Sequence, residues 1–323
     1  MIKNPPLIKK VVEEMGGTFE EIIPERGCYY IHVRGKAFLI TRKFRIAKTF
    51  IGIVGTTEYK DLTYTLLRRC SLPTPATVFF FRKNFKPEDV AAKLAAIRFP
   101  IIVKDASGSN SKGIFPHIKN LAEARTVITG EIANYRALVA QEMIFGKEYR
   151  ILILDDKVIG ALEMIPPRVV GDGKSTIAQL IQEKQKHTRR KTPIDPTLKK
   201  ILSEQGFSLE HVLDAGKTAS IRKNSSLAEG GETRDVTELV HPGIVSICAK
   251  AADAIGDYLA GIDIICEDAS LDPAKQTFGI LEINGKPDIY IHYKPTHGQS
   301  RNVVKDIINF ILKLNTTQKS DLC

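Results

Sequence analysis

The sequence predicts an α+β protein, in which antiparallel strands and helices alternate along the chain. Residues 149–154 and 157–164 are apolar runs joined by Asp155-Asp156, which is typical of a β-hairpin. Residues 261–265 and 279–284 are two further apolar runs, separated by a polar loop, and we expect them to pair as antiparallel strands. Helical spacing of apolar residues occurs at 60–70, before these strands, where Leu62, Leu66 and Leu67 are expected on one apolar face. It occurs again at 241–259, between the two pairs of strands.

Length and composition narrow the class of protein. The chain has 323 residues, enough for two or three domains, and no apolar run long enough to span a bilayer. The first residues lack the apolar segment of a secretory signal. The five cysteines show no CxxC spacing, so we expect free thiols. These features favour a cytoplasmic protein without a membrane partner, and they are compatible with a homo-oligomer.

The formal net charge of +10 raises the alternative of nucleic-acid binding. Lys and Arg are spread along the chain, with the densest cluster at 184–191 and a second pair at Lys199-Lys200. No aromatic residues are interleaved in that cluster for base stacking. A basic protein can equally handle polyphosphate or acidic substrates. We therefore do not expect nucleic acid as the partner, although the role of residues 184–218 stays open.

Turn residues mark the end of an N-terminal unit at 1–75. Ser71-Leu72-Pro73-Thr74-Pro75 ends the first unit. The expected helices are residues 7–15, 60–70, 86–98, from 120 onward, 176–186, 241–259 and 303–314. The other expected strands are residues 18–23, 29–33, 36–41, 78–81, 99–104 and 138–143. Residues 166–174 are expected to form an irregular loop.

Acidic residues inside the apolar runs indicate a metal site. Glu282 and Asn284 are two positions apart on one expected strand, so they face the same side. Antiparallel pairing with residues 261–265 would bring Asp263 to them. Carboxylate and amide oxygens suit Mg²⁺. Each residue taken alone could equally be a polar strand end that faces water.

The loop from Ser107 to Gly113 has the composition of a phosphate-binding loop. It is not a Walker A motif, because Ile114-Phe115 stand where Lys and Ser or Thr are required. A Rossmann fingerprint is also absent. Flexible backbone N–H groups could still close over phosphates, with Lys104 beside them. Lys104, Glu148 and Arg150 could also be solvent-facing strand residues.

In this order, the features resemble the ATP-grasp superfamily of carboxylate–amine ligases. Within it, they are similar to the ATP-grasp modules of cyanophycin synthetase and of bifunctional glutathione synthetases. Three stretches carry the resemblance, which covers about residues 60–311: residues 60–75; residues 166–174 with their Val-Gly-Asp-Gly-Lys core; and residues 227–242 with Gly230-Gly231, Asp235-Val236-Thr237 and His241-Pro242. The sequence departs from the family at Lys286-Pro287-Asp288, at Asp105 and at Ala228-Glu229. The resemblance implies that the chain after the N-terminal unit divides into a small lid at 76–145, a larger unit at 146–316 and a tail at 317–323.

The resemblance implies a role for each matching residue. Lys60 and Lys104 would contact nucleotide phosphates, and Glu148 would hold the ribose. The mobile loop would include Ser107, Gly108, Lys112 and Gly113, with Glu142 and Ile144 at the adenine hinge and Arg150 in the same nucleotide-binding set. Asp263, Glu282 and Asn284 would bind one or two Mg²⁺, which Mn²⁺ could replace. Arg222 and Arg301 would contact the substrate acid or acyl phosphate; a surface salt bridge is the alternative for both.

The resemblance also implies an activity. An acid, expected to be an amino acid or small peptide, would attack ATP to give an acyl phosphate and ADP, and an amine would then displace phosphate. His292 or His297 could position that amine, or both could be structural. The alternative is an ATP-grasp module that binds nucleotide without catalysis.

Overall fold

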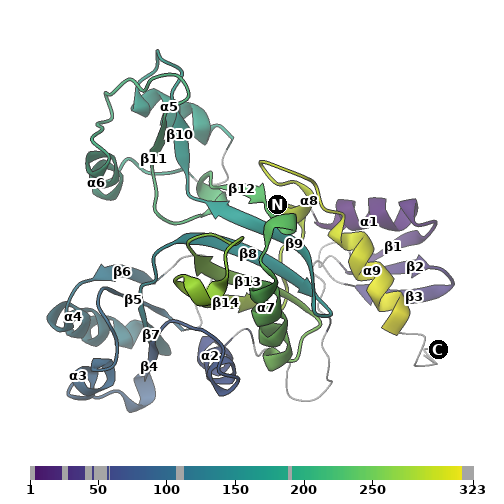
Figure 1. The fold of residues 1–323 in the computed structure, drawn as a ribbon, viewed down its shortest axis with the longest axis horizontal. Coiled ribbons are helices and arrows are strands. Elements are labelled where there is room, and N and C mark those ends of the chain that lie inside the picture. Colours follow the sequence, from purple (N-terminus) through teal and green to yellow (C-terminus); the bar gives the residue numbers. More distant parts are fainter. Residues whose placement is uncertain are drawn as a thin grey trace. The chain divides into compact units, whose positions relative to one another are not determined.

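The computed structural model describes residues 4–23, 28–40, 46, 57, 59–106, 113–187 and 191–314, with the elements labelled in Figure 1. Two compact units share the chain. Unit 1 comprises Met1–Ala161, Thr237–Tyr293 and Arg301–Cys323. Unit 2 comprises Leu162–Val236 and Lys294–Ser300. The domain boundaries at residues 75, 145 and 316 stay predictions.

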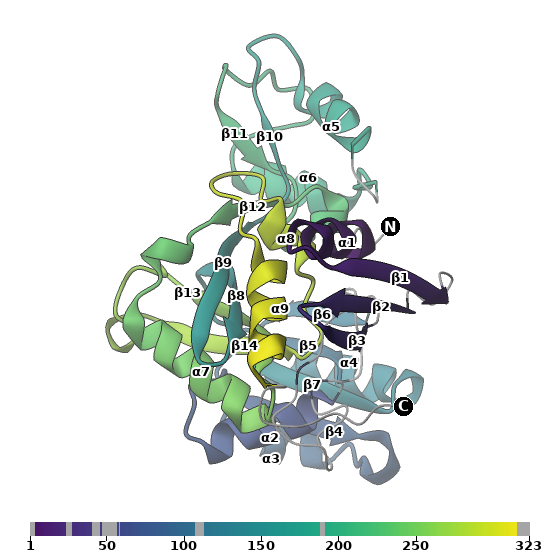
Figure 2. The same ribbon diagram turned by 90° about the vertical axis from the view of Figure 1, so that its right-hand side faces the viewer.

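The N-terminal part of unit 1 is a three-stranded antiparallel sheet with helix α1 (Asn4–Glu14) against it. Its strands are β1 (Thr18–Ile23), β2 (Cys28–Val33) and β3 (Lys36–Ile40). Helix α9 (Val303–Leu314) lies beside α1 in both ribbon views (Figures 1 and 2). Apolar residues of α1, β2 and α9 share one buried core with residues of the central sheet, so the two ends of the described chain meet there.

A four-stranded antiparallel sheet forms the second part of unit 1, in the order β4-β7-β5-β6. The strands are β4 (Thr77–Phe81), β7 (Ala137–Glu142), β5 (Ile101–Asp105) and β6 (Ile114–Ile118). Helices α3 (Asp89–Leu94) and α4 (Leu121–Glu131) complete its own core. Asn120 begins α4, because its side chain accepts a hydrogen bond from the Glu123 N–H at 2.9 Å. Helix α2 (Lys60–Arg69) precedes this sheet.

The central sheet of unit 1 has the order β9-β8-β13-β14 and is antiparallel where β8, β13 and β14 pair. The strands are β8 (Lys147–Leu154), β9 (Lys157–Ile165), β13 (Leu259–Cys266) and β14 (Phe278–Asn284). Helix α7 (Pro242–Ile255) packs against β8 and β13, and the short helix α8 (Tyr290–Tyr293) follows β14. Gly256 ends α7 in the left-handed conformation, with φ of 73°.

Unit 2 contains β10 (Arg168–Val170) paired with β11 (Thr218–Ser220), and β12 (Glu232–Asp235) paired with the end of β9. Helices α5 (Ile177–Gln185) and α6 (Pro196–Glu204) cover its core. The segment 294–300 joins β12 through backbone hydrogen bonds between His297 and both Thr233 and Asp235, each 2.9 Å long.

The Val-Gly-Asp-Gly stretch has a structural explanation within unit 2. A Cβ on Gly171 would lie 2.2 Å from the backbone oxygen of Asp214, so only glycine permits this close approach. The Asp172 carboxylate accepts hydrogen bonds from the backbone and hydroxyl of Ser175 and from the Lys174 N–H. These bonds lower the pKa of Asp172 to about 2. Asp172 therefore stabilises the turn that leads into α5.

The α+β architecture and the antiparallel pairs are confirmed, and four local expectations are wrong. Residues 166–174 contain β10, because Val169 is buried in the core of unit 2. Helix α7 ends at Ile255, and α3 spans only Asp89–Leu94. Helix α2 buries Thr63, Tyr64 and Leu67, whereas Leu62 is 41% exposed.

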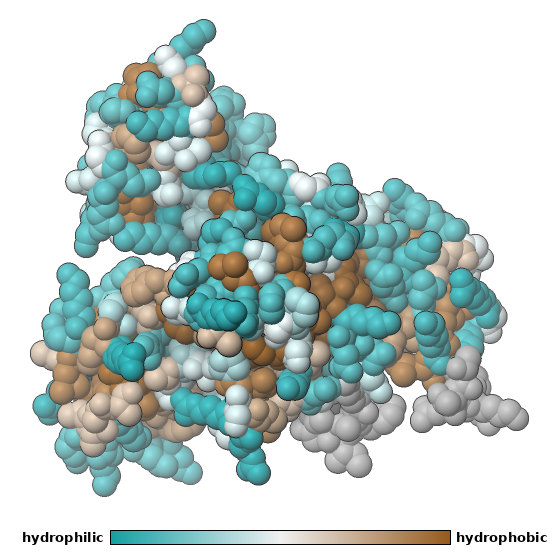
Figure 3. Space-filling view, in the orientation of Figure 1, coloured by the Kyte–Doolittle hydropathy of each residue, from teal (hydrophilic) through white to brown (hydrophobic). Residues whose placement is uncertain are grey.

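Hydrophilic side chains cover most of the face shown in Figure 3, with apolar side chains exposed between them. Among the described residues, every helix is too short or too polar to cross a lipid bilayer.

Candidate active site

One face of the central sheet carries the charged residues. Asp263 on β13 lies opposite Arg150 on β8 and opposite Glu282 on β14. Directly opposed residues of an antiparallel sheet share a face, and this periodicity adds Glu148 and Asn284 to it. The same face continues through Leu152 into the apolar core near α1 and α9. The opposite face is apolar and includes Ile151, Ile262 and Ile283, all buried. The sheet therefore presents a polar site on one face, and its other face is fixed by packing in the core.

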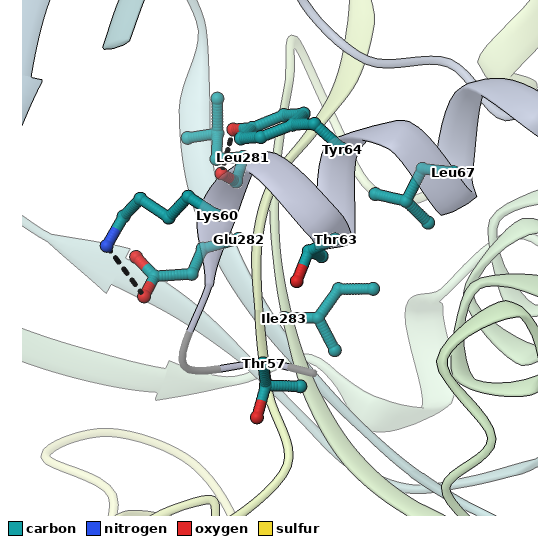
Figure 4. A pocket seen from close by; sticks show the side chains of 8 residues that line it. All are labelled: Thr57, Lys60, Thr63, Tyr64, Leu67, Leu281, Glu282 and Ile283. Atoms are coloured by element: carbon teal, nitrogen blue, oxygen red, sulfur yellow. Dashed lines mark hydrogen bonds and ion pairs between the residues drawn. The ribbon is translucent and has the colours of Figure 1, made fainter. Parts of the chain in front are cut away.

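Ion pairs and hydrogen bonds connect these side chains. The Lys60 Nζ, at the start of α2, lies 3.7 Å from a carboxylate oxygen of Glu282, and Figure 4 shows the two side chains pointing toward each other. The guanidinium of Arg150 binds Asp263 through two nitrogens, one of them at 2.9 Å. Asn284 Nδ2 donates to the same carboxylate at 3.3 Å. Burial lowers the pKa of Arg150, but the charge and hydrogen bond of Asp263, together with the charges of Glu282 and Asp288, raise the pKa overall.

Lys104, on β5, interacts electrostatically with the charged residues of this face. Burial lowers its pKa to about 8, against an opposing effect of Glu282, and the positive charge of Lys60 lowers it further. Burial also raises the pKa of Glu148 to about 7, and the charge of Asp263 adds to this shift. A half-buried cation and a half-buried carboxylate, both partly desolvated, are what a site for a multiply charged ligand would need before the ligand binds.

The remaining residues predicted to bind nucleotide make contacts with the backbone or with apolar neighbours, or lie outside the described residues. Ser107, Gly108 and Lys112 lie outside the described residues. Gly113 has φ of +64°, and a Cβ there would lie 2.8 Å from the Tyr135 hydroxyl oxygen. The Glu142 N–H donates to the Ala76 oxygen at 2.9 Å, which fixes the end of β7. Ile144 packs close to Gly279 on β14. The described contacts leave the adenine role of these two residues a prediction.

The two candidate arginines fall in different units. Arg222, in unit 2, is 9% exposed and donates to Asp195 Oδ2 at 3.0 Å and to the Pro193 oxygen at 2.9 Å. Arg301, in unit 1, donates to Glu238 Oε1 at 2.6 Å. Both therefore make ion pairs, the alternative foreseen for them, and their contact with a substrate remains a prediction.

The two candidate histidines also lie in different units. His292, in unit 1, is fully buried, and a Cβ on Gly160 would lie 2.6 Å from its Nδ1. His297, in unit 2, lies 3.1 Å from Glu232 through Nε2. Arg168 and Lys184 bind the same carboxylate. These contacts favour structural roles for both histidines.

Sequence reasoning missed Gln141 and Tyr64. Gln141 on β7 is 2% exposed and accepts a hydrogen bond from Lys104 Nζ at 3.0 Å. Tyr64 on α2 is 3% exposed, and its hydroxyl lies 2.6 Å from Gln141 Nε2. A glutamine directly after the apolar run Leu138-Val139-Ala140 was the available signal, because buried amides need hydrogen-bond partners.

The oxygen donors on this face fit a magnesium ion. Asp263 and Glu282 lie opposite each other on neighbouring strands, and Asn284 contacts Asp263. Two carboxylates and an amide oxygen are hard ligands of the type that Mg²⁺ prefers. Within the described ranges, no group of three or more His, Cys, Asp or Glu side chains suited to a metal occurs. The set with Asn284 would therefore need water and ligand oxygens to complete an octahedral shell.

The raised pKa of Glu148 predicts a pH dependence of stability. The folded-state pKa of about 7 exceeds the ordinary value of 4.5, so the folded state binds more protons between these two pH values. This contribution to the free energy of unfolding is complete below pH 4.5 and is lost as the pH rises through 7; its size is up to about 3 kcal/mol. Glu148→Gln should therefore flatten the decline in urea midpoint between pH 5 and pH 7.5. An unchanged decline would contradict the assignment.

Comparisons with known proteins agree with this geometry. Residues 57–175 match the family model for the RimK-like ATP-grasp domain. Cyanophycin synthetase of Geminocystis herdmanii is 29% identical over 269 residues, which cover 79% of this chain and 30% of that protein. The glutathione biosynthesis bifunctional protein GshAB of Desulfotalea psychrophila is 33% identical over 309 residues, covering 91% of this chain and 39% of that protein. The chain thus spans about a third of the length of these relatives.

The fold comparison covers more of the chain. The crystal structure of a bifunctional glutathione synthetase from Pasteurella multocida superimposes with a TM-score of 0.73 over 97% of this chain and 44% of that one, at 20% sequence identity. This similarity extends beyond the family-model match on both sides, and it confirms the predicted fold. Residues 57–175 of the chain therefore carry a RimK-like ATP-grasp domain, and 97% of the chain shares the fold of the matching part of the bifunctional glutathione synthetase.

Proposed function

We propose that the chain is a Mg-ATP-dependent carboxylate–amine ligase, which forms an amide or peptide bond and releases ADP and phosphate. The observation that carries the proposal is the convergence of two lysines, one arginine and three carboxylates at one face of the central sheet. Cations there would hold phosphates, and carboxylates would hold the divalent ion that accompanies them. The similarity to cyanophycin synthetase and to GshAB supports the same reaction class.

Each residue has a distinct task in this proposal. Lys60 and Lys104 neutralise the phosphates, and Glu148 accepts hydrogen bonds from the ribose hydroxyls. Asp263, Glu282 and Asn284 hold Mg²⁺, which screens the charge of the transferring phosphoryl group. Arg150 holds Asp263 in place from the neighbouring strand. Arg301, in unit 1, is proposed to bind the acid substrate, and Arg222, in unit 2, is a separate candidate for that contact.

The reaction requires positioning rather than a protein nucleophile. A carboxylate oxygen of the acid attacks the γ-phosphorus of ATP, and the bond to the bridging oxygen breaks to release ADP. The amine nitrogen then attacks the acyl carbon, phosphate leaves with the bonding electrons, and the amine loses a proton. Side chains that are fixed before the ligand arrives stabilise the developing charge without reorganising. The acid and amine are proposed to be amino acids or small peptides.

The test uses hydroxylamine as the amine. The protein, ATP, Mg²⁺ and hydroxylamine are incubated with single amino acids and dipeptides, and hydroxamate and nucleotide products are measured. A hydroxamate formed together with ADP and phosphate is expected for one class of acid. AMP and pyrophosphate would contradict the acyl phosphate. ATP binding without a hydroxamate across the panel would favour a nucleotide-binding module instead.

A further inference from the structure

A chain of hydrogen bonds connects Lys104 to the backbone of the strand that carries Glu282. Lys104 Nζ donates to Gln141 Oε1 at 3.0 Å. Gln141 Nε2 donates to the Tyr64 hydroxyl oxygen at 2.6 Å and to Thr77 Oγ1 at 3.0 Å. The Tyr64 hydroxyl in turn donates to the backbone oxygen of Leu281, the contact drawn as a dashed line in Figure 4. The chain therefore joins β5, β7 and α2 to β14.

The direction of every bond in this chain is determined by two backbone carbonyls. The oxygens of Leu281 and Pro75 can only accept, so the Tyr64 hydroxyl must donate to the first and the Thr77 hydroxyl to the second, at 2.7 Å. Both hydroxyl oxygens must then accept from Gln141, which places its NH₂ group on their side. The amide oxygen is left facing Lys104. The orientation of the amide thus follows from the network.

The network members have almost no access to solvent. Gln141, Tyr64 and Thr77 are 2%, 3% and 3% exposed. A buried donor or acceptor that loses its partner is not rescued by water, so the bonds hold each other in place. Burial also raises the pKa of the Tyr64 hydroxyl, which keeps its proton and stays a donor.

The network ends at an irregularity of β14. Asp263 pairs with Glu282, whereas the next residue, Ile264, pairs with Ile280, so Leu281 is the extra residue of a β-bulge. An extra residue leaves its backbone groups out of the ladder, and the Tyr64 hydroxyl bonds the carbonyl of Leu281. Bulges change the direction of neighbouring side chains, and the neighbour here is Glu282.

We infer that Gln141 and Tyr64 are positioning residues that hold the Lys104 amine and the Glu282 bulge in register for nucleotide binding. Neither side chain needs to touch the nucleotide for this role. The inference rests on the proposed function, because it assigns Lys104 and Glu282 to the Mg-ATP site.

Binding of Mg-ADP, measured by calorimetry, tests the inference with four variants. Tyr64→Phe removes one hydroxyl at nearly constant volume and should weaken binding about tenfold, and Gln141→Leu should weaken it at least as much. Because both act through one network, the double variant should bind about as weakly as Gln141→Leu alone, not a hundredfold weaker than wild type. Gln141→Glu should also weaken binding, since a carboxylate still accepts from Lys104 but cannot donate to two hydroxyl oxygens.

Tyr29→Phe is the matched control, because Tyr29 is a tyrosine 1% exposed in the core near α1. It should leave Mg-ADP affinity unchanged even where it lowers the melting temperature. Wild-type affinity in Tyr64→Phe or Gln141→Glu, or additive losses in the double variant, would overturn the inference while the proposed function stands. Failure of the wild-type protein to bind Mg-ADP or Mg-ATP would overturn the proposed function, and the inference with it.

Discussion

Glu282→Ala is expected to abolish amide formation, with a loss of at least about a thousandfold in kcat, while the protein stays folded. The carboxylate is the proposed partner of Mg²⁺ and lies 3.7 Å from Lys60. Its side chain is 41% exposed, so solvent screens its interaction with Lys60, and we expect folding to lose little when the carboxylate is removed. The measurement is the rate of ADP and hydroxamate release, with thermal unfolding recorded alongside.

A control variant tests whether losing any exposed carboxylate, rather than the proposed metal ligand, reduces turnover. Glu183→Ala removes an exposed carboxylate, 63% accessible, from an ion pair with Lys186 on α5 in unit 2. It should keep wild-type turnover and a similar melting temperature. If Glu282→Ala retained turnover within tenfold of wild type, Glu282 would be removed from the proposed metal site.

Lys104→Met is expected to weaken Mg-ATP binding by at least about a hundredfold and, at the same time, to raise the free energy of unfolding at pH 7. The folded-state pKa of about 8 lies below the ordinary value of 10.5, so protonation of Lys104 opposes folding below pH 8. Removing the charge relieves about 3 kcal/mol, and the unpartnered Gln141 oxygen costs about 2 kcal/mol. The net expected gain is about 1 kcal/mol.

Urea unfolding and calorimetric nucleotide binding measure the two effects on the same samples. Lys147→Met serves as the control, because Lys147 is half-exposed and pairs with Asp268 at 3.5 Å. Lys147→Met should change neither the free energy of unfolding nor the affinity for nucleotide appreciably. A Lys104→Met protein that lost both stability and nucleotide affinity would indicate that Lys104 holds the fold together, not the phosphates. The expected opposition of stability and affinity is typical of residues kept for ligand binding.

The predictable part of the site depended on local periodicity. Alternation along a strand placed Glu282 and Asn284 on one face, and antiparallel pairing added Asp263, because both rules are independent of the rest of the fold. Arg150 lies on a different hairpin and entered the predicted site only through the family resemblance, because its pairing with Asp263 depends on β8 lying beside β13. Strand periodicity and pairing are therefore sufficient to group Asp263, Glu282 and Asn284.

The unpredicted part depended on packing between distant elements. Helical spacing favoured Leu62 as a buried residue of α2, but Tyr64 occupies the buried position since its hydroxyl bonds β7 and β14. Gln141 escaped notice because its partners come from α2, β4 and β5, none adjacent to it in sequence. Similarly, the Val-Gly-Asp-Gly stretch carried the family resemblance, but the close approach of residue 214 that requires Gly171 could not be seen in the sequence.

Unit 2 is formed by two separate segments of the chain, which has a consequence for synthesis on the ribosome. Its second segment, Lys294–Ser300, is separated from the first, which ends at Val236, by the 57 residues 237–293. Thr233 and Thr296 exchange backbone-to-hydroxyl hydrogen bonds of 3.0 Å, so β12 lacks these partners until the later segment has emerged. A nascent chain stalled before residue 294 would consequently expose an incomplete sheet edge. Completion of unit 2 is thereby coupled to translation of the chain through residue 300.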